Sequence, residues 1–285
     1  MPPIITLITD FGTRDSYVSE MKGVILSLVA DVHLVDITHD VEPQQVAEAA
    51  LTLEAAVATF PAGTVHLAVV DPGVGTDRRA IVVAAGGQLF VGPDNGLFTP
   101  MFAHAESRVF ELAAGEYRRP VVSRTFHGRD IFAPAAAHLA NGVAPERFGP
   151  AVGDPVRLSW PEAREGADGV EGTVIHVDRF GNLVTSIGAE HVATVLADGR
   201  AAVRVAGRVL PLVGTYGELS PGRAGALIGS RNRLEVVVRD GSAAARLGAG
   251  RGTAVVLRRT TPISKMSRSR RSRTTEKACL RKKEC

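Results

Sequence analysis

The sequence predicts an α/β N-terminal domain with a mainly parallel sheet and flanking helices, followed by a smaller all-β, barrel-like C-terminal domain. In the first half of the chain, short β-branched runs alternate with segments whose apolar residues recur at helical spacing. In the second half, short strand-like runs are separated by glycine-rich turns, without a long helical pattern. Alternating strands and helices favour a parallel sheet, whereas successive short strands favour a barrel or a sandwich.

The first half begins with a βαβαβ pattern. Its strands are expected at residues 4–9, 33–37 and 65–70, and its helices at 18–28 and 46–60. Further strand-like runs follow at residues 80–85, 90–92 and 121–126, and an alanine-rich helix is expected after His127. In sheets of this kind ligands bind beyond the carboxyl ends of the strands, so polar residues at strand exits are the first candidates for function.

The pattern changes between residues 149 and 169, where proline, glycine and charged residues mark a linker. We therefore expect a catalytic α/β domain at 1–155, a linker at 156–169 and the β domain at 170–258. The strands of the β domain are expected at residues 170–177, 183–187, 201–213, 234–238 and 253–257. Residues 259–285 have no apolar periodicity, and we expect a basic, disordered tail there.

The charge of the chain is unevenly distributed. The formal net charge is +3, yet residues 262–285 alone contain nine Lys or Arg and two Glu. The rest of the chain is therefore acidic, and we do not expect nucleic-acid binding, because a basic run without a folded reader is weak evidence. Both cysteines, Cys279 and Cys285, lie in this tail, which excludes a disulfide or a thiolate metal site in the folded part. With no signal-peptide pattern and no apolar run of membrane-spanning length, a cytoplasmic protein is expected.

A charged loop lies between two of the expected buried strands. Asp71 follows the strand at 65–70, and Arg78 and Arg79 precede the strand at 80–85. A turn needs only Pro72 and the neighbouring glycines, so the charged residues point to function. Asp71, Arg78 and His127 together could hold a water molecule and manage its proton, while we expect Arg79 to be a solvent-facing neighbour.

Other residue patterns narrow the chemistry. The chain has no Walker motif, no complete dinucleotide fingerprint, no metal-ligand spacing such as His-Glu-x-x-His and no Gly-x-Ser-x-Gly elbow. We therefore expect no metal and no cofactor. Asp10, Asp15, Asp94 and Asn95 add polar groups at strand exits that could hold sugar hydroxyls or a cation, although Asp15 is equally compatible with a helix cap.

Six motifs, in order, carry a resemblance over about residues 4–257. They are Thr9-Asp10-Phe11-Gly12 with Asp15 and Met21-Lys22-Gly23, Asp71-Pro72-Gly73-Val74-Gly75, Pro93-Asp94-Asn95-Gly96, Phe126-His127-Gly128-Arg129-Asp130, Asp178-Arg179-Phe180-Gly181-Asn182, and Gly229-Ser230-Arg231. In these motifs the chain resembles the S-adenosyl-L-methionine (SAM) hydrolases, or SAM hydroxide adenosyltransferases, which are related to fluorinase and chlorinase.

The resemblance implies that water attacks the 5′ carbon of the SAM ribose and releases adenosine and methionine. It also implies that Asp71, Arg78 and His127 position and activate the water, that Asp10 binds the ribose and that Asp15 lies at the methionine end. The second-domain groups implied around adenine and the amino-acid end are Asp178, Phe180, Asn182, Ser230 and Arg231. Members are typically homotrimers with the site between one subunit's first domain and a neighbour's second.

Two alternatives stay open. One is a halide-using, chlorinase-like adenosyl transferase, against which Asp71 and His127 argue, because halogenase-type relatives have a less anionic pocket at these positions. The other is a protein that binds SAM without turnover, which would not need a water-activating set. Ser186 and Arg239 depart from residues common in the family, so details of adenine recognition are open.

Overall fold

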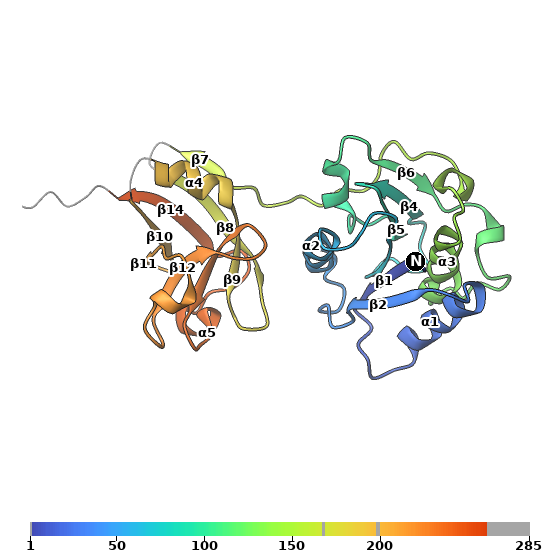
Figure 1. Cartoon of the computed structure of the whole chain (residues 1–285), viewed down its shortest axis with the longest axis horizontal. Helices are drawn as coiled ribbons and strands as arrows, with labels where there is room; N and C mark the ends of the chain where they lie inside the picture. Colours follow the sequence, from blue (N-terminus) through green and yellow to red (C-terminus); the bar gives the residue numbers. More distant parts are fainter. Residues whose placement is uncertain (1, 167–168, 198–199, 261–285) are drawn as a thin grey trace, which may run out of the picture. The chain divides into compact units, whose positions relative to one another are not determined.

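The computed structural model describes residues 2–166, 169–197 and 200–260 (Figure 1). The chain divides into two compact units, Met1–Trp160 and Pro161–Cys285, which are described separately here. The basic tail predicted from the sequence falls outside the described residues, except for positions 259 and 260. The finer bounds of the predicted linker stay a prediction.

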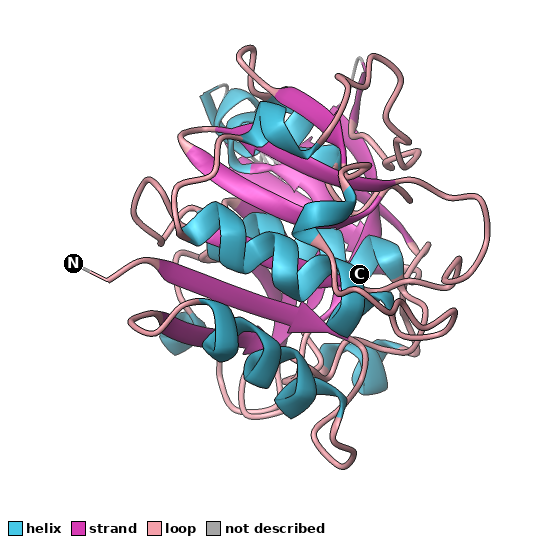
Figure 2. Cartoon of the chain, turned by 90° about the vertical axis from the view of Figure 1, so that its right-hand side faces the viewer, coloured by secondary structure: helices cyan, strands magenta, loops and turns pink. Residues whose placement is uncertain are grey.

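The first unit is a mixed, mostly parallel sheet between layers of helices (Figure 2). Its strand order is β2-β1-β3-β5-β4-β6, in which β4 pairs antiparallel with both β5 and β6. The strands are β1 (Ile4–Thr9), β2 (His33–Thr38), β3 (Val65–Val69), β4 (Ala80–Ala85), β5 (Gln88–Pro93) and β6 (Arg108–Glu111). The α/β prediction is confirmed for this unit, with helices α1 (Tyr17–Leu28), α2 (Val46–Val57) and α3 (Ala133–Ala140).

Apolar side chains cover both faces of this sheet. On one face Met21 and Ile25 of α1 and the alanines of α3 pack against Leu7 and Leu67. On the other face Leu53 of α2 packs with residues of β1, β3, β4 and β5. Because β1 and β3 are covered on both faces, they read in the sequence as mainly apolar runs, interrupted by Thr6 and Thr9 in β1 and by His66 in β3.

Residues 121–126 do not form the strand expected there. This segment is an exposed loop, in which Val121 is 81% exposed, and it leads into a short π-helical turn at Gly128–Phe132. Its valines suggested a strand, but the loop has no neighbouring strand with which to pair. His127 therefore reaches its position from a loop and not from a strand exit.

The second unit is an antiparallel, nearly closed β-barrel, as the sequence predicted. The strand order is β11-β10-β14-β8-β9-β13-β12. The segment that follows β11 meets β12 through a hydrogen bond of 2.8 Å from Val213 N to Ala226 O. The strands are β7 (Arg164–Gly166), β8 (Gly169–Val177), β9 (Leu183–Gly188), β10 (Arg200–Val205), β11 (Arg208–Pro211), β12 (Ala224–Ile228), β13 (Arg233–Val238) and β14 (Ala254–Thr260).

Several details of this barrel differ from the sequence expectation. The run at 201–213 is a hairpin and not one strand, since Ala206 and Gly207 adopt positive φ angles of 46° and 73°. A helix, α4 (Ala189–Ala197), inserts Val192 and Val195 into the barrel core, and a short one, α5 (Ala243–Leu247), follows β13. Strand β7 lies within the predicted linker and pairs with β8.

Candidate active site

The charged loop predicted from the sequence carries a compact polar cluster. Asp71 follows β3 and Arg78 precedes β4, and their side chains are 5% and 10% exposed. Arg78 Nε donates to Asp71 Oδ1 at 2.9 Å and to Oδ2 at 3.1 Å, while Nη2 also donates to Oδ2. This forked, charge-assisted contact fixes the Arg78 guanidinium beside the end of β3.

His127 completes the cluster from a distant part of the chain. Arg78 Nη2 lies 2.8 Å from His127 Nδ1. A guanidinium can only donate, so Nδ1 accepts and the neutral imidazole carries its proton on Nε2. Burial, and next the positive charge of Arg78, hold the pKa of His127 below its usual value, which favours this neutral form. The structure thus brings together Asp71, Arg78 and His127, as the sequence predicted.

Close packing holds the two loops of the cluster against each other. Gly75 has a φ of 79°, and a Cβ on it would lie 2.6 Å from the carbonyl oxygen of Arg124. A larger residue here would push the loop of Asp71 and Arg78 away from the loop that precedes His127. Below the cluster, the Phe132 ring lies 5.2 Å from the Arg78 guanidinium carbon.

Asp130, which the sequence analysis left without a role, anchors the turn that carries His127. Its side chain is fully buried and accepts hydrogen bonds from Arg129 Nε at 2.8 Å, Arg119 Nη1 at 3.0 Å and Ser123 N at 2.8 Å. Burial alone would raise the pKa of Asp130, but these donors, Arg129 foremost, lower it to about 2. The carboxylate therefore connects the loop at 118–126 to the π-helical turn. Single π-helical turns are common at functional sites.

Asp10 lies at the end of β1, held by polar contacts on both sides. Its Oδ2 accepts from the backbone of Gln44 at 2.8 Å. The preceding residue, Thr9, places its hydroxyl 2.8 Å from Nδ1 of the buried His39, whose Nε2 faces Asp36 Oδ1 at 3.1 Å. The backbone carbonyl of His39 also accepts from Gly12 N at 2.8 Å. His39 therefore contacts the residues on both sides of Asp10. Asp15 is exposed in the loop before α1.

Asp94 and Asn95 follow β5 and make contacts within the first unit. The buried Asp94 accepts from Arg79 Nε and from Val156 N, both at 2.8 Å. Asn95 donates to the carbonyl of Val70, the residue before Asp71, at 2.8 Å. The expectation that Arg79 is only a solvent-facing neighbour is wrong, because Arg79 also binds Asp154 through Nη1 at 2.7 Å. It clamps the chain after β5 to the segment near Asp154.

In the second unit, Asp178, Phe180 and Asn182 share one tight turn between β8 and β9. Asp178 Oδ1 accepts from Phe180 N at 2.9 Å and from Asn182 N at 2.8 Å, and its Oδ2 accepts from Asn182 Nδ2 at 2.9 Å. The Phe180 side chain is 77% exposed. An aromatic ring presented to solvent on a rigid turn can stack on a planar ligand.

Ser230 and Arg231 lie exposed in the turn between β12 and β13, which Gly229 N closes by donating to Arg233 O at 3.0 Å. Beyond these predicted residues, the buried Glu235 of β13 and Tyr216 lie in the same region of the unit. Tyr216 Oη is 3.3 Å from Asn182 Nδ2. Arg239, a departure from the family pattern, donates to Leu219 O at 2.7 Å and so holds the segment that carries Tyr216.

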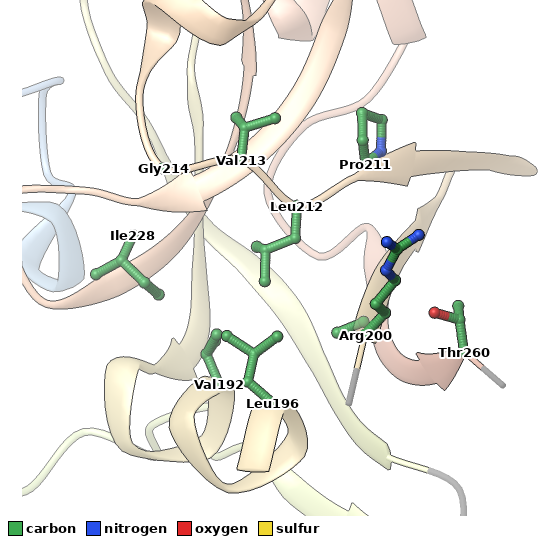
Figure 3. Close-up of a pocket in the computed structure, with 10 residues that line it drawn as sticks. Val192, Leu196, Arg200, Pro211, Leu212, Val213, Gly214, Ile228 and Thr260 are labelled. Carbon is green, nitrogen blue, oxygen red and sulfur yellow. The ribbon is translucent and has the colours of Figure 1, made fainter. Parts of the chain in front are cut away.

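A separate pocket of about 680 Å³ opens on the barrel beside α4 (Figure 3). Val192 and Leu196 of α4 face Leu212 and Ile228 across it, and Arg200 lies at its edge. This mainly apolar pocket contains none of the predicted site residues. Within residues 2–166, 169–197 and 200–260, no group of three or more His, Cys, Asp or Glu could hold a metal ion, and no helix is long and apolar enough to cross a membrane.

Comparison with known proteins identifies the family. Residues 5–149 match the SAM hydroxide adenosyltransferase N-terminal domain, and residues 172–256 match the corresponding C-terminal domain. The chain belongs to the SAM hydroxide adenosyltransferase family. The family resemblance seen in the sequence motifs is thereby confirmed.

Relatives within the SAM hydroxide adenosyltransferase family are similar over most of their length. The (R)-S-adenosyl-L-methionine hydrolase of Thermus thermophilus is 42% identical over 90% of this chain and 100% of its own, and that of Salinispora tropica is 41% identical over 86% and 94%. The fluorinase of Actinopolyspora mzabensis is 30% identical over 65% of this chain and 71% of its own. The crystal structure of an uncharacterized conserved protein from Thermotoga maritima matches with a TM-score of 0.83 and 35% identity, over 89% of this chain and 99% of that one.

Proposed function

We propose that this chain hydrolyses (R)-S-adenosyl-L-methionine to adenosine and L-methionine, using Asp71, Arg78 and His127 to position and deprotonate the attacking water. The observation that carries this function is the partly buried Asp71–Arg78–His127 cluster in a chain that is 42% identical, over 90% of its length, to an (R)-SAM hydrolase. Fluorinases match over a smaller part of the chain and at lower identity.

The substrate determines what the site must supply. SAM is a sulfonium, and its methionine leaves as a neutral thioether, so the leaving sulfur needs no proton. In the proposed step a water oxygen forms the bond to the 5′ carbon, the bond from that carbon to sulfur breaks, and its electron pair stays on sulfur. The site must therefore align water, carbon and sulfur and take a proton from the water.

Within the cluster we assign the proton to Asp71. His127 Nδ1 accepts from Arg78, so the imidazole offers only its Nε2–H, a donor that can orient the water oxygen. Arg78 is a permanent cation and cannot accept a proton. Asp71 is the member of the trio that can accept, and Arg78 holds its carboxylate in place.

The predicted substrate contacts remain part of the proposal. Asp10 is assigned to the ribose, Asp15 to the methionine end, and Asp178, Phe180, Asn182, Ser230 and Arg231 to the adenine and amino-acid ends. For Asp94 and Asn95 the observed contacts support an indirect role, because they bind Arg79, Val156 and Val70. On the family resemblance, we also propose that the chain is cytoplasmic and that it forms a homotrimer. Light scattering on the purified chain would test the homotrimer.

Chromatographic detection of adenosine and methionine tests the reaction. Wild-type protein should release both from the (R) epimer, and Asp71→Asn and His127→Ala should each lower kcat by about 10²-fold or more. Asp77→Asn, an exposed carboxylate in the same loop, is the matched control and should keep full activity. A chlorinated nucleoside formed in the presence of chloride would contradict hydrolysis, and binding without products would indicate a SAM-binding protein.

A further inference from the structure

A pocket of about 780 Å³ on the first unit is lined by residues of helices α1 and α3 and of the segment at 116–120. The two helices pack against each other in the layer on one face of the sheet (Figure 1). A pocket of this volume is within the usual range of small-molecule sites. Its lining does not include Asp71, Arg78 or His127, so it is separate from the proposed catalytic cluster.

Arginines outnumber carboxylates in the lining of this pocket. Arg118, Arg119 and Arg129 line it together with Glu20 and Glu116. Glu20 is already engaged, because it accepts from Arg129 Nη1 at 2.9 Å. The lining therefore favours an anionic ligand over a cationic one.

Arg118 has hydrogen-bonding capacity that its neighbours do not use. Its Nη2 donates to the carbonyl of Leu112, whereas its Nε has no hydrogen-bond partner among the described residues. Burial lowers the pKa of Arg118, and the charge of Glu111 offsets this only in part. Keeping a guanidinium in such a place costs free energy, which a bound anion would offset.

The backbone of the segment at 116–120 is held in place from both sides. The Tyr117 ring lies 4.5 Å from the ring of Phe148. Arg119 donates from its backbone N to the carbonyl of Asp130 at 2.9 Å and from Nη1 to Asp130 Oδ1 at 3.0 Å. Because this backbone is already ordered, a ligand that binds its arginines pays little entropy for fixing it.

The remaining part of the lining is apolar and open. It includes Val24 and Leu28 of α1 and Pro134 of α3. A Cβ added at Gly23 would meet no atom within 4 Å, so the wall of α1 leaves free space there. An inorganic anion alone would not use this apolar wall, which instead suits the carbon body of a larger ligand.

We propose that this pocket binds a phosphomonoester, with its phosphate at Arg118 and Arg119 and its carbon body against Val24 and Leu28. A phosphate group carries a charge of about −1.5 to −2 at pH 7 and three strong acceptor oxygens. Planar guanidinium groups match such oxygens with parallel N–H donors. This inference goes beyond the proposed hydrolysis and does not depend on it.

The pocket is coupled to the catalytic cluster through charge. Burial lowers the pKa of His127, and after it Arg78 lowers it, Asp71 raises it, Arg118 lowers it and Asp130 raises it. A phosphate beside Arg118 would offset the effect of that arginine. Binding in the pocket should therefore raise the pKa of His127.

Calorimetry on the full-length protein without SAM tests the site, with ribose 5-phosphate and inorganic phosphate as probes. Wild type should bind ribose 5-phosphate more tightly, and Arg118→Gln should weaken the binding of both probes by about 10-fold or more. Gly23→Leu keeps every arginine and fills the open wall, so it should weaken the binding of ribose 5-phosphate by about 10-fold. Arg147→Gln, an exposed arginine of the same unit, is the control and should change neither affinity.

Equal affinity for the two probes, no saturable binding, or unchanged affinity for ribose 5-phosphate in either pocket variant would overturn the proposal. Urea unfolding shows whether Arg118→Gln is folded, and Gly23→Leu decides the matter if it is not. NMR titration gives a second readout, since ribose 5-phosphate should raise the pKa of His127 in wild type but not in Arg118→Gln. A rise in both would place the anion at Arg78 and overturn the pocket assignment. Neither measurement uses SAM, so a failure of the proposed hydrolysis would leave both results standing.

Discussion

Arg78 Nη2 donates to Nδ1 of His127 across 2.8 Å, and this one contact sets the protonation state of the candidate site. The same guanidinium donates hydrogen bonds from Nε to both carboxylate oxygens of Asp71. A protonated His127 would direct an N–H at another donor, so the cluster as observed requires the neutral ring. Acidification should therefore disrupt the cluster, but only below the ordinary pKa range of histidine, because burial and Arg78 lower the pKa of His127.

Replacing Arg78 should raise the pKa of His127. In Arg78→Gln the positive charge that disfavours imidazolium is gone, while Asp71, which favours it, remains. NMR titration of His127 should give a higher pKa in Arg78→Gln than in wild type, and kcat should fall by about 10²-fold or more because Asp71 and His127 lose their common partner.

Arg208→Gln, an exposed arginine of β11 in the second unit, is the control and should leave the titration unchanged. A His127 pKa that is equal or lower in Arg78→Gln would show that Arg78 does not set the protonation state of the ring.

Asp94→Asn should destabilise the first unit more than it weakens substrate binding. Asp94 is buried and accepts from Arg79 Nε and Val156 N, so the change leaves part of a charge-assisted pair unmet and should cost about 2 kcal/mol in unfolding free energy. Asp154→Asn removes the other partner of Arg79. Because the Asp154 side chain is 84% exposed and its ion pair is screened by solvent, this change should destabilise the unit far less than Asp94→Asn.

Urea unfolding followed by circular dichroism measures both variants. A large rise in KM for Asp94→Asn, without loss of stability, would instead favour direct substrate contact.

The fold class was predictable because burial on both faces leaves a direct mark on sequence. Strands β1 and β3 are covered by helices on both sides and appear as mainly apolar runs. The hairpin at Ala206 and Gly207 was not predictable, since Ala206 in a left-handed conformation is not a recognised turn signal. The loop at 121–126 was misread because β-branched composition does not reveal whether a neighbouring strand exists.

The candidate site was predictable where function depends on residues near strand exits. Asp71 at the exit of β3 and Arg78 in the same loop follow that pattern, and they converge with His127, which comes from a loop. The contacts of Arg79 and Glu235 could not be predicted from strand exits, because tertiary packing determines which residues lie next to them. Arg79 meets Asp154, which is 75 residues away, and Glu235 meets the Gly229 turn only through the register of β12 and β13.

His39 should act as a positioning residue for Asp10. Its ring lies 2.8 Å from the Thr9 hydroxyl and its carbonyl accepts from Gly12 N, so it braces the turn on either side of Asp10. His39→Gln and Thr9→Val should each raise KM for SAM about fivefold, the effect of one hydrogen bond, with little change in kcat.

The double variant of His39 and Thr9 should be no worse than either single one, because both changes remove the same contact. Fully additive effects on KM would show that the two side chains act independently.

His66 should make the first unit sensitive to acid. It is fully buried, lies 2.7 Å from the Thr6 hydroxyl through Nδ1 and stacks on Phe90, and burial lowers its pKa to about 4. The unfolded chain takes up a proton near pH 6.5 while the folded one does not, so unfolding is favoured as the pH falls from 6.5 to about 4. The full effect is about 3 kcal/mol, at about 1.4 kcal/mol for each pH unit.

His66→Gln keeps a polar side chain that does not titrate, and it isolates this contribution from those of the other histidines. Urea unfolding at pH 7, 6, 5 and 4.5 should show the difference in unfolding free energy between wild type and His66→Gln shrinking or reversing as the pH falls, since wild type alone loses the His66 contribution. A difference that stays constant over this range would mean that the buried ring is protonated in the folded protein as readily as in the unfolded chain, which its burial in the sheet opposes.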